Sequence, residues 1–228
     1  MRKLLMIIGS LLIFPLNLYA QAWAKDVLAS SIGYHDPEGK WNQFSGTFTI
    51  KVVSKNRSTF LRKVSIDLPR EYFELVQTRE DDIKVYRIEK GVFATEDSVT
   101  QARTLKLRDY HTYLYGLPMK LKDPGTQIDP KTERVVFYGK ESIRMRVTYD
   151  PSVGSDTWYF YFDPQTYALT AYQFYHNEAM GDGEYILLDQ LEEVEGIRMP
   201  KIRSWYYNID ESYLGTDELV SDKDSSSR

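Results

Sequence analysis

Two aromatic stretches, Trp158-Tyr159-Phe160-Tyr161-Phe162 and Tyr172-Gln173-Phe174-Tyr175, decide how this chain folds. Aromatic residues are good strand formers, and successive residues of a strand point to opposite faces of the sheet. The stretches therefore place large apolar groups on both faces. One face must form a core, and the other needs a cover, which is helices, a partner protein or an apolar ligand held in a concave sheet.

Alternate residues of these two strands are the candidates for a ligand-binding face. The sequence does not decide which parity points inward, and packing beneath helices is an equally physical use for the same side chains. Tyrosine suits a ligand or partner site because its hydroxyl tolerates a wet rim. The candidates are Trp158, Phe160, Phe162, Tyr172 and Phe174.

Extended segments continue on both sides of the aromatic stretches. Phe48, Ile50 and Val52 alternate with polar residues, which predicts a half-buried strand. Further short segments follow closely and are separated by turn residues, so antiparallel meander connections are expected. Ten or eleven strands are predicted in all, which gives a mainly β fold with a few helices.

Two segments have helical spacing instead. Residues 23–32 predict a short N-terminal helix, and residues 99–114 predict a second helix for which Asp97 or Ser98 is the N-cap. Residues 123–130 are rich in proline and glycine and predict a loop.

The first twenty residues have the order of a secretory signal peptide. Arg2 and Lys3 precede the apolar stretch Leu4–Leu16, and helix-breaking residues follow before Ala20. The apolar stretch is about a dozen residues, whereas a helix needs roughly 20 to cross a bilayer. We expect cleavage of residues 1–20 and no integral membrane segment in the remaining chain.

The rest of the chain is predicted to form one domain. Residues 21–216 are expected to be a single β-rich domain, and the serine-rich, charged residues 217–228 a disordered tail. The chain has no cysteine, which excludes disulfides, thiolate nucleophiles, cysteine-bound metal and a lipid-modified N-terminal cysteine.

The charge of the chain argues against some classes of partner. The sequence has 29 basic and 33 acidic side chains, and removal of Arg2 and Lys3 with the signal peptide leaves 27 basic ones and a formal charge of −6. Nucleic acid and anionic membrane surfaces attract basic proteins. We therefore expect neither as a general partner.

Catalytic and metal-binding patterns are weak. A nucleophile elbow and a glycine-rich phosphate loop are both absent from the sequence. The histidines and their acidic neighbours are the remaining metal candidates, but none has paired spacing such as His-x-x-x-His. Ordinary turn and strand histidines are the favoured interpretation, and no metal site is expected. No cofactor is expected. These candidates are His35, Asp36, His111, His176 and Glu178.

Several segments resemble an uncharacterised family of exported proteins from Bacteroidota. Residues 110–126, which read YHTYLYGLPMKLKDPGT, and residues 156–164, which read DTWYFYFDP, carry this resemblance. Residues 34–37 and 182–188 resemble the family as well. The resemblance covers nearly all of the expected mature chain, but such a family assigns no catalytic role to any residue.

A second, shorter motif resembles periplasmic lipoprotein carriers of the LolA and LolB type. In it, a strand that ends in Phe162-Asp163-Pro164-Gln165-Thr166 is followed by another strand. This resemblance implies a curved antiparallel sheet, or half-open β-barrel, whose concave apolar face is covered by helices and holds acyl chains.

Together these features favour a periplasmic or secreted binding protein that holds a lipid or other apolar group on its concave face. Residues 110–118 and the loop to Pro130 would then form a movable lid, which adds Tyr113 and Leu117 to the candidate ligand-binding residues. The alternatives are an envelope protein-interaction module that uses strand addition, and a metal-dependent enzyme that uses His35, Asp36 and His111.

Overall fold

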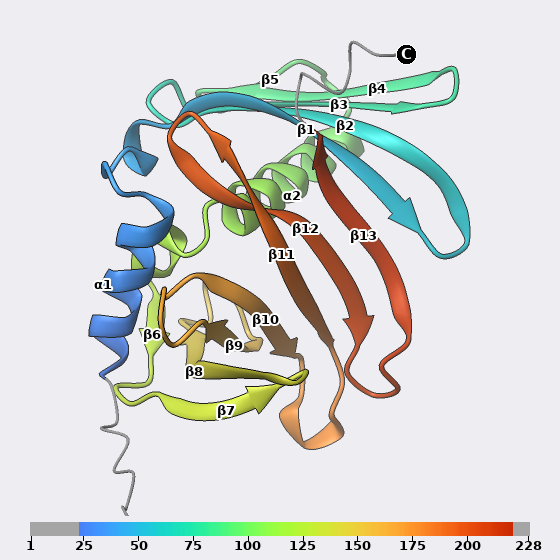
Figure 1. Ribbon diagram of the computed structural model, residues 1–228. Coiled ribbons are helices and arrows are strands. Elements are labelled where there is room, and N and C mark those ends of the chain that lie inside the picture. Colours follow the sequence, from blue (N-terminus) through green and yellow to red (C-terminus); the bar gives the residue numbers. More distant parts are fainter. Residues whose placement is uncertain (1–22, 221–228) are drawn as a thin grey trace, which may run out of the picture.

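One antiparallel sheet of 13 strands dominates the computed structural model, which describes residues 23–220. Its order is β5-β4-β3-β2-β1-β13-β12-β11-β10-β9-β8-β6, and β7 also pairs with β8. Figure 1 shows that the sheet is strongly curved, with β1–β5 above and β6–β10 below. The prediction of a mainly β, curved antiparallel fold with a few helices is confirmed, while the predicted signal peptide lies outside the described residues.

The strands are β1 (Ser45–Ser54), β2 (Arg57–Asp67), β3 (Tyr72–Arg79), β4 (Asp82–Glu89), β5 (Val92–Phe93), β6 (Thr126–Ile128), β7 (Glu133–Phe137), β8 (Lys140–Tyr149), β9 (Thr157–Phe162), β10 (Leu169–Tyr175), β11 (Glu184–Val194), β12 (Ile197–Tyr207) and β13 (Tyr213–Val220).

The last strand, β13, corrects the predicted C-terminal boundary. Residues 217–220 were expected to begin a disordered tail, but they belong to β13, which pairs with β1 on one side and β12 on the other. In this strand every second residue is buried, namely Gly215, Asp217 and Leu219. The charged side chains hide this alternation in the sequence, because Asp217 is itself one of the buried positions. Residues 221–228 of the predicted tail lie outside the described chain.

The number of strands also differs from the ten or eleven predicted. The two that the sequence did not reveal are β13 and β6, and β6 lies inside the segment 123–130 that was predicted as a loop. β6 has only three residues, which pair with Val147–Tyr149 at an edge of the sheet. So short an edge strand leaves no alternation that a pattern could detect, and the flanking turn residues dominate.

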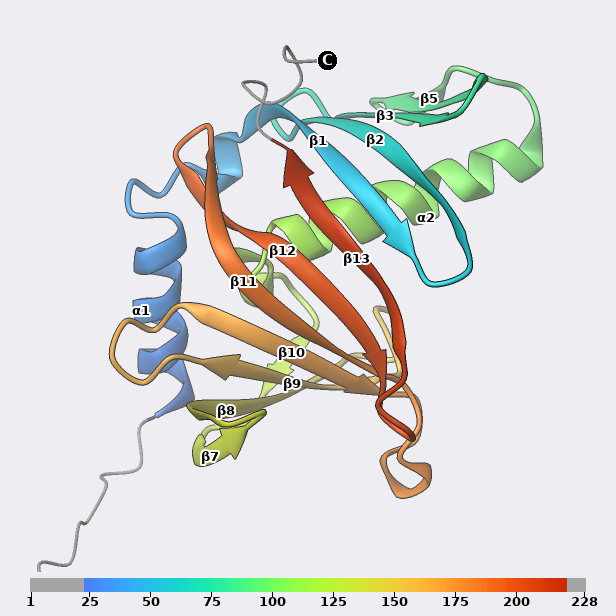
Figure 2. The same cartoon turned by 45° about the vertical axis from the view of Figure 1, so that its right-hand side comes forward.

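Two α-helices accompany the sheet. α1 (Ala24–His35) lies along one side, and α2 (Ser98–Tyr115) crosses the hollow of the curved sheet (Figure 2). The Asp97 carboxylate accepts a hydrogen bond from the Thr100 amide at 2.8 Å, so Asp97 is the N-cap of α2. Three short 3-10 helices, η1 (Trp41–Gln43), η2 (Met119–Lys122) and η3 (Glu178–Met180), complete the elements of the described chain.

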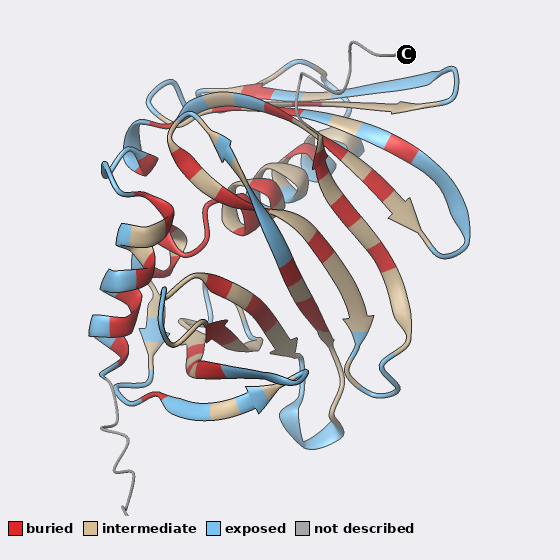
Figure 3. Cartoon of the chain, viewed as in Figure 1, coloured by how far each residue is buried: buried red, intermediate tan, exposed pale blue. Residues whose placement is uncertain are grey.

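The core lies between the concave face of the sheet and these helices. The predicted alternation in β1 is confirmed, because Phe48, Ile50 and Val52 are buried while the residues between them are more exposed. Figure 3 shows the same alternation of buried and less buried positions along β13. The hydrophobic cluster continues from β1 to β9 and to the turn after α2, so both ends of the sheet share one core.

The C-terminal end of α2 packs too closely for any side chain at Gly116. A Cβ atom there would lie 2.2 Å from Trp41 Cζ2 and 2.6 Å from the Thr112 carbonyl oxygen. Gly116→Ala should therefore lower the free energy of unfolding by about 1–3 kcal/mol through overpacking. Urea unfolding followed by tryptophan fluorescence measures this change.

Gly33→Ala is the matched control, because Gly33 lies within α1 and a Cβ atom there meets nothing within 4 Å. Alanine is a better helix former than glycine, so the free energy of unfolding of this variant should rise by roughly 0.5–1 kcal/mol. Equal effects of the two substitutions would contradict the close approach of Trp41 to Gly116.

Candidate functional site

Alternate aromatic residues of β9 and β10 face helix α2 from the concave side of the sheet. The strand registers align Phe160 with Tyr172, Tyr172 with Ile186, and Ile186 with Trp205, which places one apolar row across four strands. The five candidate residues of these strands belong to the hydrophobic cluster or pack against it: Trp158, Phe160, Phe162, Tyr172 and Phe174. The structure thereby decides the parity that the sequence left open.

Helix α2 covers this row through its tyrosines. The Tyr110 ring stacks on Trp205 at 6.2 Å between centroids, and the Tyr113 ring meets Trp158 edge-on at 5.7 Å. The Tyr113 hydroxyl is hydrogen-bonded to the Tyr149 hydroxyl of β8. The cover that the aromatic strands require is thus supplied by the chain itself, and Tyr113 lies on it.

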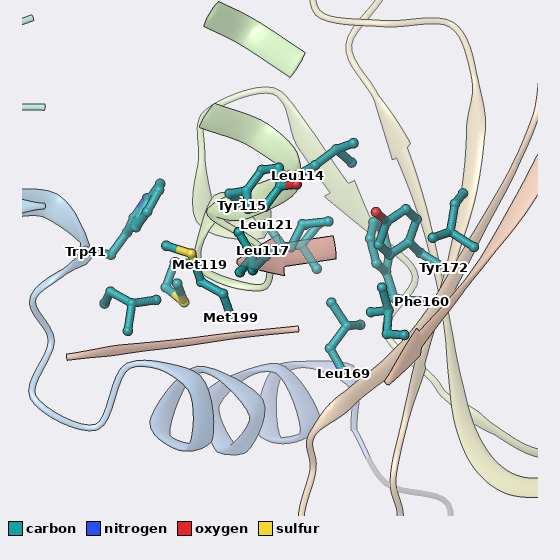
Figure 4. Packing of buried hydrophobic residues seen from close by; sticks show 14 of the residues in the cluster. Trp41, Leu114, Tyr115, Leu117, Met119, Leu121, Phe160, Leu169, Tyr172 and Met199 are labelled. Atoms are coloured by element: carbon teal, nitrogen blue, oxygen red, sulfur yellow. The ribbon is translucent and has the colours of Figure 1, made fainter. Parts of the chain in front are cut away.

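Leu117 has a different setting from Tyr113. It follows α2 in the turn before η2 and is buried in the cluster with Met119 and Leu121 (Figure 4). Its side chain is therefore part of the packing that fixes the end of α2.

A cleft of about 820 Å³ opens beside the C-terminal half of α2. The β2–β3 turn, η2 and the β8–β9 loop form its other walls. Of the seven predicted residues, Trp158 and Tyr113 line it. The other five do not: Phe160, Phe162, Tyr172 and Leu117 are buried, and Phe174 is half-buried. The aromatic row thus reaches the surface at Trp158.

The cleft combines an apolar wall with acidic groups. Tyr72, Phe73 and Tyr149 join Trp158 and Tyr113 in its lining. The charged residues that line it are five acidic side chains and two basic ones: Asp67, Glu71, Asp109, Asp123, Asp156, Arg108 and Lys120. Such a surface favours apolar or amphipathic molecules and gives them a negatively charged approach.

Sequence reasoning missed two charged residues on the concave face. Arg203 of β12 and Asp217 of β13 are cross-strand partners, and both are buried. Arg203 shares its parity with Trp205 in a predicted strand, so a charge at an inward position was detectable in principle. Asp217 fell in the predicted tail and had no such signal.

The histidines have separate structural roles. Leu169 N donates a hydrogen bond to His35 Nε2 at 2.9 Å, so the ring carries its proton on Nδ1, which donates to the Arg198 carbonyl at 2.6 Å. His111 Nδ1 donates to the Leu107 carbonyl within α2. Asp36 accepts from the Lys40 and Trp41 amides.

These positions do not form a metal site. His35 and Asp36 belong to α1 and its C-cap, His111 to α2, and His176 pairs with Asp156 at 2.9 Å instead. Within residues 23–220 no group of three potential ligands lies close enough to hold a metal ion.

Comparison with protein families assigns the chain to one family. A family of unknown function, DUF6503, matches residues 4–222. The chain belongs to this family. No curated protein sequence matches this DUF6503 protein, and no helix in its described part is long and apolar enough to span a membrane.

Solved structures resemble this DUF6503 protein in fold. A LolA superfamily protein from Nitrosomonas europaea is 8% identical over 88% of this chain and 92% of that chain, with a TM-score of 0.53. A lipoprotein-sorting protein domain from Vibrio parahaemolyticus is 8% identical over 87% and 88%, with a TM-score of 0.46. A DUF1329 protein from Desulfovibrio piger is 8% identical over 86% and 91%, with a TM-score of 0.46. The predicted LolA-like fold is confirmed by the first of these.

The buried histidines should make the protein sensitive to acid. Burial lowers the pKa of His35 to about 4 and that of His111 to about 3, whereas both are near 6.5 in an unfolded chain. The unfolded state then binds more protons as the pH falls below about 6.5, so stability decreases. At about pH 4.5 each of these two histidines should lower the free energy of unfolding by about 2–3 kcal/mol relative to neutral pH.

Substitution isolates this contribution. Compared with the wild type, His111→Phe keeps an aromatic ring in place and should lose about 2–3 kcal/mol less between neutral pH and about pH 4.5. His176→Gln is the control of opposite sign, because Asp156 raises the pKa of this exposed histidine. Urea unfolding at both pH values gives the comparison, and an unchanged pH dependence in His111→Phe would contradict the assignment.

Proposed function

We propose that this protein binds the apolar chain of a lipid or similar amphiphile between the concave face of its sheet and helix α2. The observation that carries this proposal is the continuity of the aromatic row. It begins in the core at Phe160 and Tyr172 and reaches an open cleft at Trp158. A ligand that enters the cleft therefore meets apolar surface along its whole path inward.

The size and chemistry of the cleft support an apolar ligand. Its volume of about 820 Å³ falls within the range of roughly 300–1,000 Å³ that is typical of small-molecule sites. Each methylene that is buried contributes about 0.8 kcal/mol, so about ten buried methylenes of a long chain contribute about 8 kcal/mol toward binding.

Helix α2 acts as the movable cover in this proposal. It touches the concave face through the rings of Tyr110 and Tyr113, whose contacts with Trp205 and Trp158 a bound apolar chain can replace. The segments on either side, residues 94–97 and 116–130, connect the helix to the sheet. Leu117 lies in the core beyond the C-terminal end of the helix.

The proposed location is the periplasm or the outside of the cell. It is supported by the predicted signal peptide, residues 1–20, with the β-rich domain beginning at residue 21. The LolA-like fold, which the chain shares with the Nitrosomonas europaea protein, supports the same location, because the resemblance to the LolA and LolB carriers implies a periplasmic protein. The excess of acidic over basic side chains in the sequence favours a lipid or protein partner over nucleic acid.

A brominated fatty acid tests the proposed binding face, because bromine quenches tryptophan fluorescence on contact. The chain has four tryptophans, and Trp158 lies on the concave face. A variant that keeps only Trp158, with the others changed to Phe, should be strongly quenched in a saturable manner.

The matched control keeps only Trp23, which is 55% exposed at the start of α1 and outside the cleft. It should retain its fluorescence under the same conditions. Quenching of Trp23 alone, or of neither residue, would overturn the proposed face.

A second candidate function rests on the outer edge of β4. β5 pairs only with Ile88 and Glu89 of this strand, and Ile83 and Val85 are 64% and 50% exposed. An extended segment of another envelope protein could add to this edge as a further strand. Protection of the β4 amides from hydrogen exchange by envelope proteins, without quenching of Trp158, would favour this function over lipid binding.

A further inference from the structure

Arg203 is a buried cation with an unused binding edge. Its side chain is 1% exposed, and only Nη1 is bonded, donating to the Pro200 carbonyl at 2.7 Å. Nε and Nη2 have no hydrogen-bond partner among residues 23–220. These two nitrogens form one edge of the planar guanidinium, and that edge presents two parallel N–H groups to a carboxylate or phosphate.

The charges around Arg203 are not balanced. Its cross-strand partner is Asp217, and the guanidinium of Arg62 acts on the same carboxyl group. Burial raises the pKa of Asp217, and both arginines oppose this rise. Two cations thus share one buried acid on this part of the concave face, which favours the arrival of a further negative charge.

Two tyrosine hydroxyls complete the polar group. Tyr115 of α2 places its ring 3.8 Å from Arg203 Cζ, and Tyr172 of β10 lies close enough for the guanidinium to oppose the rise of its pKa. Burial raises the pKa of both phenols, so both keep their protons. Neither oxygen atom makes a hydrogen bond of good geometry within the described chain, and the Tyr172 hydroxyl lies within bonding reach of the guanidinium. Each hydroxyl therefore still has its proton to donate beside Arg203.

Tyr172 connects this polar group to the cleft. Its ring lies 6.0 Å from Trp158, which lines the cleft, and it is aligned with Phe160 in the apolar row. A molecule with a charged head and an apolar chain matches this order of groups, because the head meets Arg203 and the chain meets Phe160 and Trp158.

A purely structural role explains the arrangement poorly. A buried guanidinium with two unpaired nitrogens is costly, and apolar residues of similar volume are commonly as stable or more stable at such positions. A ligand that pairs with the Nε–Nη2 edge removes this cost when it binds, and the polar group then contributes to affinity instead.

We propose that Arg203, with the hydroxyls of Tyr172 and Tyr115, binds the anionic head of an amphiphile, a carboxylate or phosphate, whose chain lies along the aromatic row. This inference rests on the proposed lipid-binding function and adds the head-group chemistry to it. The ring of Tyr115, at the C-terminal end of α2, covers Arg203 in the described conformation, so the head reaches Arg203 when this end of α2 moves.

The test compares chains of equal length with different heads, bound to the full mature protein. Palmitate and hexadecyl phosphate carry the anion, and hexadecanol has the same chain without it. The wild type should bind at least one of the anionic probes about tenfold or more tighter than hexadecanol, as a charge-assisted pair implies. Inorganic phosphate alone should bind far more weakly than either anionic chain.

Arg203→Met should remove this preference and leave the affinity for hexadecanol nearly unchanged. Arg144→Met is the matched control, since Arg144 lies on β8 with its guanidinium over the ring of Tyr159 and paired with Glu133. It removes one positive charge at a distance and should keep the preference. If Arg203→Met does not fold, the double variant Arg203→Met/Asp217→Asn removes both buried charges together. Arg203→Lys keeps the positive charge but lacks the two parallel N–H groups of the Nε–Nη2 edge.

NMR of carboxyl-labelled palmitate gives a readout that packing alone would not change. Bound to the wild type, the carboxylate should stay ionised at a pH where the free acid is protonated, and Arg203→Met should abolish this difference.

The outcomes separate this inference from the proposed function. Equal affinity of the wild type for charged and neutral chains would overturn the anionic site and leave lipid binding intact. Binding of none of the chains would overturn both. Tight binding of inorganic phosphate by itself would replace the amphiphile with a small anion.

Discussion

The fold depends on the pairing of β13 with both β1 and β12. Strands β1 to β5 form one antiparallel meander and strands β7 to β12 another, to which β6 is added on β8. The last strand joins the two by backbone hydrogen bonds. Without this strand, β1 and β12 would each be an unpaired edge. The two halves of the sheet are therefore joined by a long-range contact between the first strand and the last strand of the described chain.

The pairing of β13 also completes the concave face, where charged groups lie among the apolar side chains that stabilise the fold. The same rows of side chains that form the core carry Arg203 and Asp217, which belong to the joining strand and its neighbour. Apolar burial stabilises the fold, whereas two charges in the same layer oppose it. Departures of this kind from the rules of core packing occur where function requires them, which is why the polar group merits a chemical explanation.

Helix α2 links this face to the proposed function. It is capped by Asp97, ends against Trp41 at Gly116, and contacts the sheet through tyrosines rather than through aliphatic side chains alone. Tyrosine rings give apolar contact, while their hydroxyls make bonds that water or a ligand can replace. The family and the LolA-like fold leave the activity open, because one fold serves many functions. The site on the concave face is therefore the basis of the proposed activity.

The sequence by itself determined the class of fold, most strands and both helices, and it limited the N-cap of α2 to Asp97 or Ser98, because periodicity and turn residues are local signals. It also identified the aromatic strands that face α2. It did not decide which parity faces inward, the place of β13, or the partners of Arg203. Tertiary structure decided these, because Asp217 is an unremarkable charge along the chain and becomes a buried one only when β13 lies between β1 and β12. Burial and pairing across distant strands arise only when the whole sheet has assembled, so no local sequence pattern predicts them.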